Sequence, residues 1–385
     1  MKFTSTLVAA AGLLASPALA APYAQLQTRN TTSSSSTVEQ PVLNVTYTSP
    51  VNSSLPNVVI FATGGTIAGS SASNTDTTKY TAGVVGIEAL VQAVPNILNV
   101  TNVVGSQVAN TGSVNINSTI ILRMAKLANG ILCAENSTTD GLVITHGTDT
   151  LEETAFFMDM TVNCKSPVVV VGAMRPSTAI SADGPANLLE AVTVAVSPAA
   201  RNRGAMIVLN DRIGQATYTS KTNANSLDTF QAIEQGYIGG FLSNKPFFYY
   251  PASQPTFKNK FDVTNITELP QVDVLISYQN FDAALIPAAV KAGAKGIVIG
   301  GTGAGSTTDV AQPYIEAALA AGIPIVLSSK TNGGAVPPSG SGAISSGFLN
   351  PVKSRLQLQL ALATGMGMEE IRGLFEDKLA GYLEA

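Results

Sequence analysis

The chain is poor in metal-binding side chains and in charge. It has one histidine, His146, and two cysteines, Cys133 and Cys164, in 385 residues, so a zinc site would need scattered carboxylates as further ligands. Only 12% of the residues are charged, and the net charge of -4 comes without a long basic run. That balance argues against a surface for nucleic acid. We expect no metal, no cofactor and no nucleic-acid partner.

Long apolar runs are missing beyond the N-terminus. No stretch after residue 20 has the roughly 18 to 20 uninterrupted apolar residues of a membrane span, so we expect no membrane partner. Residues 1–20 open with Met1-Lys2, continue through an apolar run at 7–14 and end in Ala18-Leu19-Ala20, the pattern of a cleaved signal peptide. This predicts a mature, soluble chain from Ala21 that is secreted or held in a cell-wall or periplasmic space.

Export would permit a disulfide. The simplest interpretation of the two cysteines is one bridge between Cys133 and Cys164, and the alternative is two buried thiols. Asn-x-Ser/Thr sequons suit a glycoprotein, although a chain rich in Ser and Thr produces several by chance. They begin at Asn30, Asn44, Asn52, Asn99, Asn117, Asn136 and Asn265.

The chain divides into segments of different composition. Residues 21–55 are rich in Ser, Thr, Pro and Asn without periodicity, which predicts a disordered tail. From residue 57 on, apolar strand-like runs alternate with helix-like runs, which is typical of an α/β domain with a mostly parallel sheet. The strand-like runs are 57–62, 141–145, 167–171 and 205–209, and the helix-like runs are 152–161 and 186–196.

A second alternation begins after a stretch rich in Pro and aromatic residues. It predicts strands at 272–277, 296–299 and 323–327 and helices at 285–291 and 309–321. We therefore expect an N-terminal catalytic domain over 56–246, a linker over 247–270, and a smaller C-terminal domain with a flavodoxin-like parallel sheet over 271–385. Ligands bind at the carboxyl ends of such strands, which selects the loops after Ala62, Thr145, Val171, Ser277 and Ile299.

The first of these loops reads Thr63-Gly64-Gly65-Thr66-Ile67-Ala68-Gly69. Its glycines permit sharp turns and leave the Thr66 hydroxyl at the strand end, where it could act as a nucleophile. The loop matches neither a P-loop nor G-x-G-x-x-G. Taken alone, the Gly-Gly pair favours an ordinary tight turn.

A hydroxyl nucleophile near neutral pH needs a base. His146 follows a predicted strand and could complete a triad with a hydroxyl and an Asp, but a ring that fills space there is at least as good an interpretation. Thr148 and Asp149 share its loop. Lys221 could be the base if desolvation lowered its pKa, although a lysine is far more often a solvated surface group, and spacing alone does not select it.

The stretches Thr63–Gly69 and Ile144–Thr150 closely resemble the bacterial-type L-asparaginases, specifically the exported type II enzymes that fungi also have. The resemblance runs from about residue 57 to the C-terminus. Further similar stretches are 110–113, 171–178 and 181–185. The resemblance implies a two-domain α/β fold and a threonine amidohydrolase that converts L-asparagine to L-aspartate and ammonia, as in asparagine catabolism.

It also implies roles for individual residues. Thr66 would be the nucleophile, activated with help from Tyr80, and Thr148, Asp149 and Lys221 would form a second triad with Lys221 as proton acceptor, leaving His146 as scaffold. Substrate contacts would come from Gly65, Ser113, Val114, Gly147 and Ala173 and from Asn280 of a neighbouring subunit. Ser113 and Asp149 would hold the α-carboxylate and α-ammonium, and backbone N–H groups around Thr148 would stabilise the oxyanion.

The resemblance extends to assembly and to the bridge. It implies a homotetramer built as a dimer of dimers with shared active sites, and it places a disulfide at Cys133 and Cys164. Residues 70–78, polar and aperiodic, suit a mobile lid that carries Tyr80 over the site. The acyl-enzyme formed by Thr66 would then be hydrolysed by water.

Two positions depart from the family pattern. Val114 stands where the family usually has Gln, and Val cannot hydrogen-bond an α-amino group. The family also supplies a glutamate from the loop after the third strand of the small domain, whereas residues 328–346 contain no Glu or Asp. Both departures bear on the preference for asparagine over glutamine, and a dual glutaminase-asparaginase is therefore an alternative.

Two alternatives come from other classes. A dinucleotide-binding protein is suggested by the glycine-rich run Gly300–Gly305, but the next predicted strand ends in Ser328-Ser329-Lys330 without the acidic residue that would bind a ribose. The other is a secreted amino-acid-binding protein with a cleft between two α/β domains.

Overall fold

The computed structural model describes residues 40–340 and 342–383. The predicted signal peptide and residues 21–39 of the predicted tail lie outside the described residues. Within the described ranges, no helix is long and apolar enough to cross a membrane.

Over the described residues, the larger sheet has nine strands in the order β1-β3-β2-β4-β5-β6-β7-β10-β11. Their bounds are β1 (Tyr47–Thr48), β2 (Asn57–Gly64), β3 (Asn102–Thr111), β4 (Gly141–Thr145), β5 (Val168–Val171), β6 (Ala205–Leu209), β7 (Arg212–Gln215), β10 (Gly239–Leu242) and β11 (Lys245–Phe248). The five central strands from β3 to β6 run parallel, and the outer pairs are antiparallel. The predicted α/β fold is confirmed, with a sheet that is mixed rather than mostly parallel.

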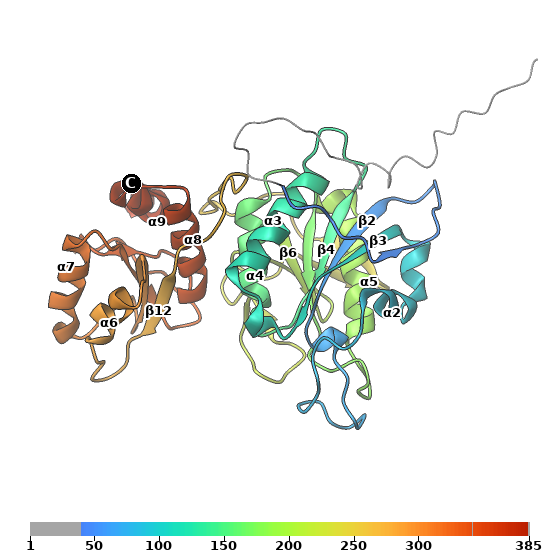
Figure 1. The fold of residues 1–385 in the computed structure, drawn as a ribbon, viewed down its shortest axis with the longest axis horizontal. Coiled ribbons are helices and arrows are strands. Elements are labelled where there is room, and N and C mark those ends of the chain that lie inside the picture. Colours follow the sequence, from blue (N-terminus) through green and yellow to red (C-terminus); the bar gives the residue numbers. More distant parts are fainter. Residues whose placement is uncertain (1–39, 341, 384–385) are drawn as a thin grey trace, which may run out of the picture. The chain divides into compact units, whose positions relative to one another are not determined.

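Helices cover both faces of this sheet (Figure 1). They are α2 (Ile87–Gln92), α3 (Ser118–Leu132), α4 (Leu151–Thr161) and α5 (Gly184–Ala195), with short 3-10 turns η1 (Thr66–Ala68), η2 (Pro95–Asn99), η3 (Ser113–Asn115) and η4 (Pro198–Ala200). Because both faces are covered, the central strands read as unbroken apolar runs, and all residues of β4, β5 and β6 are buried. The predicted disulfide joins Cys133, at the end of α3, to Cys164, shortly after α4, with 5.3 Å between their Cα atoms.

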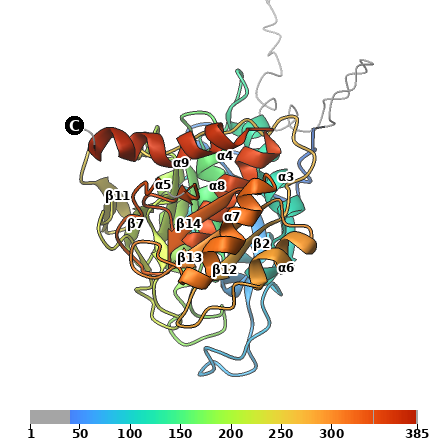
Figure 2. The same cartoon turned by 90° about the vertical axis from the view of Figure 1, so that its left-hand side faces the viewer.

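The smaller sheet has the strand order β12-β13-β14-β15, and all of its pairs are parallel. Its strands are β12 (Val272–Ile276), β13 (Gly296–Gly301), β14 (Ile325–Ser329) and β15 (Ile344–Ser345). Helices α6 (Leu285–Lys291) and α7 (Gln312–Ala320) lie in front of it in Figure 2, and α8 (Pro351–Ala363) packs behind. The remaining elements are η5 (Asp309–Ala311), α9 (Met368–Leu383) and a hairpin of β8 (Ser220–Lys221) and β9 (Phe230–Gln231).

Two predicted boundaries are wrong. Residues 40–55 are not a structureless tail, because β1 pairs with the edge of β3 and the Ser49 N–H donates to the Val103 carbonyl at 3.0 Å. An unpaired strand edge offers such backbone partners whatever the side chains are. The larger sheet also continues past residue 246, since β11 extends to Phe248. Residues 249–271 contain no helix or strand.

Candidate active site

The loop after β2 brings a threonine hydroxyl to the carboxyl edge of the larger sheet. Gly64 and Gly65 both have positive φ, 100° and 78°, a region that L side chains rarely adopt. A side chain on Gly65 would also collide with the backbone of Gly147. Gly65 therefore lets this loop lie directly against the loop after β4, and Gly64 lets it lie against the backbone of Thr111 at the end of β3. Thr66 follows at the start of η1 and is 5% exposed.

The Thr66 hydroxyl is paired with a phenol. Its Oγ1 lies 2.6 Å from the Tyr80 Oη, within the range of a strong O–H···O hydrogen bond. The segment that carries Tyr80 is tied down at several points: Ser70 bridges Thr81, and the Ser71 N–H donates to the Thr178 Oγ1 at 3.0 Å. Tyr80, two residues after the predicted lid segment 70–78, thus contacts Thr66 in this structure.

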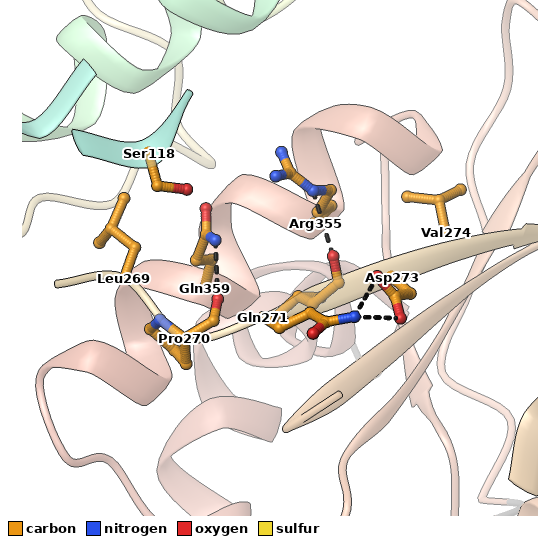
Figure 3. A pocket seen from close by; sticks show the side chains of 9 residues that line it. Ser118, Leu269, Pro270, Gln271, Asp273, Val274, Arg355 and Gln359 are labelled. Carbon is orange, nitrogen blue, oxygen red and sulfur yellow. Dashed lines mark hydrogen bonds between the residues drawn. The ribbon is translucent and has the colours of Figure 1, made fainter. Parts of the chain in front are cut away.

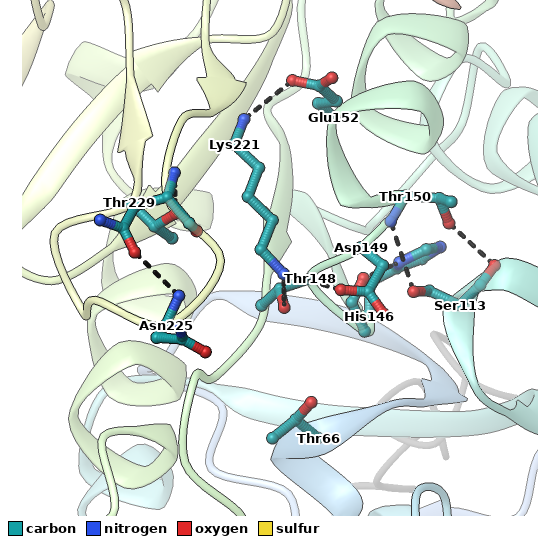
Figure 4. A network of polar contacts seen from close by, with 12 residues as sticks. Thr66, Ser113, His146, Thr148, Asp149, Thr150, Glu152, Lys221, Asn225 and Thr229 are labelled. Atoms are coloured by element: carbon teal, nitrogen blue, oxygen red, sulfur yellow. Dashed lines mark hydrogen bonds and ion pairs between the residues drawn. The ribbon is translucent and has the colours of Figure 1, made fainter. Parts of the chain in front are cut away.

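The loop after β4 carries a second hydroxyl with a lysine. The Lys221 Nζ donates to the Thr148 Oγ1 at 3.0 Å and to the Asp149 carboxylate at 2.7 Å. Figure 4 shows this cluster with the Thr66 hydroxyl directed toward it. The Lys221 side chain is 17% exposed and that of Asp149 67%, so the lysine is largely shielded while the carboxylate faces solvent. The structure brings together the five residues expected to carry the chemistry.

Lys221 sits on the short strand β8, held by a residue that the sequence did not single out. The Lys221 N–H donates to the Glu152 Oε2 at 3.0 Å (Figure 4), and Glu152 lies in the first turn of α4. The pairing of β8 with β9 supports the same strand from the other side. No local signal connects Glu152 to Lys221, because they are distant in sequence and meet only in the fold.

His146 is a buried scaffold residue. It has no exposed surface, its Nδ1 lies 2.8 Å from the Gly147 carbonyl, and its Nε2 lies 2.8 Å from the Thr154 Oγ1. A carbonyl only accepts, so Nδ1 carries the proton and Nε2 accepts from the threonine, which satisfies a neutral ring. Burial lowers the pKa of His146 from 6.5 to about 4. Both ring nitrogens are occupied, so His146 has none free to act as a base.

The remaining predicted contact residues of the larger sheet lie at the same edge. Ser113 follows β3 and is buried, and its Oγ accepts from the Thr150 N–H at 3.3 Å. A side chain on Gly147 would meet Ser113, and Ala173, two residues after β5, is fully buried. Val114 is 69% exposed. Four neighbouring loops therefore converge where the parallel strands end.

Asn280 lies apart from this cluster. It is exposed, with φ of 63°, four residues after β12 in the smaller sheet. No described hydrogen bond joins it to the Thr66 or Thr148 loops. One copy of the chain, as far as it is described, does not bring Asn280 to the other site residues.

The glycine-rich run Gly300–Gly305 is closed by its own contacts. Thr302 and Ser306 pair in a bridge, a side chain on Gly301 would collide with Gly305, and the Ser329 Oγ donates to the Gly303 carbonyl at 2.6 Å. These contacts leave no open cradle for a phosphate, which removes the basis of the dinucleotide alternative. In the described part of the chain, no group of three His, Cys, Asp or Glu residues could hold a metal ion.

A cavity of about 400 Å³ lies elsewhere (Figure 3). It is lined by Ser118, Gln271, Arg355 and Gln359 among others, and by none of the site residues above. The candidate site therefore rests on the side-chain contacts described above and does not coincide with this cavity.

Two family models match the chain. The model described as asparaginase, N-terminal, matches residues 57–254, and that described as glutaminase/asparaginase C-terminal domain matches residues 271–375. The chain is 47% identical to L-asparaginase 2 of Bacillus subtilis over 327 residues, covering 84% of this chain and 87% of that protein. It is 50% identical to probable L-asparaginase 1 of Schizosaccharomyces pombe, with 84% and 89% covered. For L-asparaginase 2 of Escherichia coli, the identity is 43%, with 83% and 93% covered.

A solved structure is similar as well. The crystal structure of a probable cytoplasmic L-asparaginase from Campylobacter jejuni superposes with a TM-score of 0.79 at 41% identity, covering 83% of this chain and 99% of that one. This relative contradicts the predicted secretion, because it is described as cytoplasmic, and the residues on which that prediction rested lie outside the described ranges. The prediction of a secreted or periplasmic protein is therefore wrong, and the glycoprotein prediction, which depended on export, loses its basis.

Proposed function

The chain belongs to the asparaginase family and is an L-asparagine amidohydrolase, and on that premise we propose that Thr66 is its nucleophile. The observation that carries the proposal is the pairing of two hydroxyls with two different activating groups at one sheet edge. Thr66 contacts Tyr80 at 2.6 Å, and Thr148 contacts Lys221 at 3.0 Å.

The proposed reaction has two steps. The Thr66 Oγ1 attacks the side-chain amide carbon of asparagine, forming a C–O bond, and the hydroxyl proton passes by way of Tyr80 and Thr148 toward Lys221. The C–N bond then breaks, and the leaving nitrogen takes up the proton that the same relay returns from Lys221 and departs as ammonia. Water attacks the resulting ester, which releases L-aspartate and restores the Thr66 hydroxyl.

Lys221, as a neutral amine, is proposed as the proton acceptor of this relay: its nitrogen lone pair takes up the proton from the Thr148 Oγ1, and an N–H still donates to Asp149. Its nitrogen is within hydrogen-bond reach of the Thr148 Oγ1, and its side chain is mostly shielded from water, which favours proton transfer over exchange with solvent. Asp149 holds the lysine in place at 2.7 Å. The backbone N–H groups of Thr148 and Asp149 make no hydrogen bond within the described residues and are proposed as oxyanion donors.

Substrate binding is proposed to use the exposed Asp149 carboxylate for the α-ammonium group and Ser113 for the α-carboxylate. Gly65, Gly147 and Ala173 would shape the floor of the site, since their lack of bulk lets the loops approach closely. Val114 offers no hydrogen bond where a Gln would. We expect a weaker hold on the α-amino group there, which leaves dual use of asparagine and glutamine as the second candidate.

A second copy of the chain is proposed to complete the site. Asn280 is exposed on the part of the chain that carries the smaller sheet, whereas the proposed catalytic side chains all come from the part that carries the larger sheet. We propose residues 56–248 as the catalytic domain and residues 271–385 as a smaller domain that lends Asn280 to a neighbour. A homotetramer with shared active sites fits this division.

The test is ammonia release from L-asparagine and from L-glutamine by the wild type and by Thr66→Ala. The proposal predicts that the variant keeps its far-ultraviolet circular dichroism spectrum and loses nearly all turnover. Turnover within about tenfold of wild type would remove Thr66 from the nucleophile role. Comparable kcat/KM values for the two amides would establish the dual specificity.

A further inference from the structure

A buried lysine outside the site touches the strand that carries Lys221. Lys353 lies in the first turn of α8 and is 1% exposed. Its Nζ donates to the Thr217 carbonyl at 3.1 Å, the Thr219 carbonyl at 2.8 Å and the Ser220 Oγ at 3.3 Å. The ammonium group thus donates to three of the four residues that precede Lys221 in the chain.

This arrangement is costly to the fold. Burying an ammonium group without a paired carboxylate disfavours its charged form, and burial lowers the pKa of Lys353 to about 8 although Glu152 and Asp159 act to raise it. No carboxylate lies within 4.0 Å of its Nζ among the described residues. A methionine of similar length would fill the same space without burying a charge. The fold therefore does not need a lysine here for packing, which points to a role for its hydrogen bonds.

Two further residues, Asn350 and Glu152, form hydrogen bonds with strand β8, which consists of Ser220 and Lys221. Asn350, the N-cap of α8, donates from its Nδ2 to the Ser220 Oγ at 3.2 Å. On the other side, the Lys221 N–H donates to Glu152. The backbone on both sides of the bond between Ser220 and Lys221 is therefore fixed by partners from α8 and α4, while the Lys221 ammonium group reaches Thr148 and Asp149.

We propose that Lys353 is a positioning residue, which fixes residues 217–220 so that the Lys221 nitrogen is held on Thr148 and Asp149. Lys353 lies on α8, in the part of the chain that carries the smaller sheet. That part therefore helps to position Lys221 in the active site of the same chain. The inference rests on the proposed role of Lys221 as proton acceptor. Lys353 touches no reacting atom and acts through Lys221.

The test is steady-state kinetics of Lys353→Met against a matched variant. Misplacement of a catalytic group by about 1 Å can cost about 100-fold, so we expect kcat to fall about 10- to 100-fold with KM within about threefold. Gln359→Met is the control, because Gln359 is also buried on α8 but donates to the Pro270 carbonyl at 2.7 Å (Figure 3), away from Lys221. We expect it to lower the Tm and leave kcat within about twofold. An equal fall of kcat in both variants would overturn the proposal.

A double-mutant cycle with Lys221→Met separates positioning from general damage. If Lys353 acts through Lys221, adding Lys353→Met to Lys221→Met lowers the residual kcat no further. Independent, multiplying effects would contradict the proposal. Should Lys221→Met alone retain wild-type kcat, the proposed function of Lys221 fails, whereas a large loss there with wild-type kcat in Lys353→Met refutes only the positioning role.

Ser220→Ala provides a milder variant in case Lys353→Met does not fold. It removes the oxygen that accepts from both Lys353 and Asn350 and keeps both donors. We expect kcat to fall about threefold to tenfold with KM unchanged. A kcat equal to wild type in a folded Ser220→Ala would count against the proposal.

Discussion

Two glycine-rich loops, Thr63–Gly69 and Gly300–Gly305, lie at the carboxyl ends of parallel strands in this molecule. The first presents a hydroxyl at the candidate site, whereas the second is closed by its own contacts. In the first, the glycines let the chain lie against the Gly147 backbone and present the Thr66 hydroxyl to Tyr80. In the second, the glycines pack on one another, and the polar groups bond within the smaller sheet. Glycine at a strand end thus permits a tight loop, and the neighbouring loops decide whether that loop becomes a site.

The largest expected effect is at Thr66, and Thr302 in the second loop provides the matched control. Thr66→Ala removes the proposed attacking oxygen, and we expect kcat to fall by about 10⁶-fold, the scale of the loss when a hydrolase loses its hydroxyl nucleophile. Thr302→Ala makes the same change in the closed loop, where the hydroxyl donates to the Ser306 carbonyl at 3.2 Å, and we expect kcat within about twofold. Ammonia release measures both. A similar fall of kcat in the two variants would contradict the proposal that the first loop carries the nucleophile and the second does not take part.

The next largest effect is expected at Lys221, which contacts Thr148 and Asp149 in the loop after β4. Lys221→Met removes the proposed acceptor and should lower kcat by about 10³-fold, within the range of general acid–base catalysis. Lys221→Arg keeps a positive charge beside Asp149 but cannot lose its proton. If Lys221 acts as a base, the Arg variant is nearly as slow as the Met variant. Recovery of kcat by Arg would show that only the charge matters.

The glycines themselves provide a matched pair. Gly65→Ala combines a positive φ with a collision against Gly147, so we expect a fall in kcat of at least about 100-fold. Gly303 has φ of 52°, and a Cβ added there would meet no atom within 4 Å. Gly303→Ala should therefore lose only about 1 kcal/mol of stability with kcat unchanged. Urea denaturation and the ammonia assay distinguish the two, and equal kcat losses would contradict the role given to the first loop.

The smallest effect concerns His146, which is buried beside the first loop with both ring nitrogens hydrogen-bonded. Its folded pKa of about 4 lies below the usual 6.5, so the unfolded chain binds the proton more tightly between these values. The free energy of unfolding therefore rises with pH through this window and is lost as pH falls. Denaturation at about pH 7 and about pH 4.5 should show a smaller loss in His146→Gln than in the wild type. An equal loss would mean that another group titrates.

The sequence predicted the alternating strands and helices well where apolar runs were short and bounded by glycine. The bounds of β4, β6 and α6 agree with the predicted runs. It missed β3 and the antiparallel edges from β7 to β11, because polar residues interrupt those strands and tertiary pairing decides them. It also missed α3, although the apolar residues of that helix recur at helical spacing. It also took residues 40–55 for a tail, since pairing of β1 with a strand edge leaves no side-chain pattern.

The site residues likewise include some that the sequence alone could predict and some that it could not. The Thr66 and Thr148 loops could be found from sequence because each follows a buried strand. Lys221 could not be chosen from spacing, since it reaches Thr148 from a two-residue strand, and only the family resemblance selected it. Glu152 and Lys353 had no signal at all, because their partners are backbone groups far away in the chain.

The most direct test of the nucleophile is a covalent label. A diazoketone analogue of L-asparagine, which alkylates the attacking oxygen, should inactivate the enzyme, and peptide mass spectrometry of the inactivated sample locates the adduct. The account predicts one label per active site on Thr66, and no such label in Thr66→Ala. A label on Thr148 that accumulates in step with the loss of activity would contradict the account and transfer the attack to the hydroxyl beside Lys221.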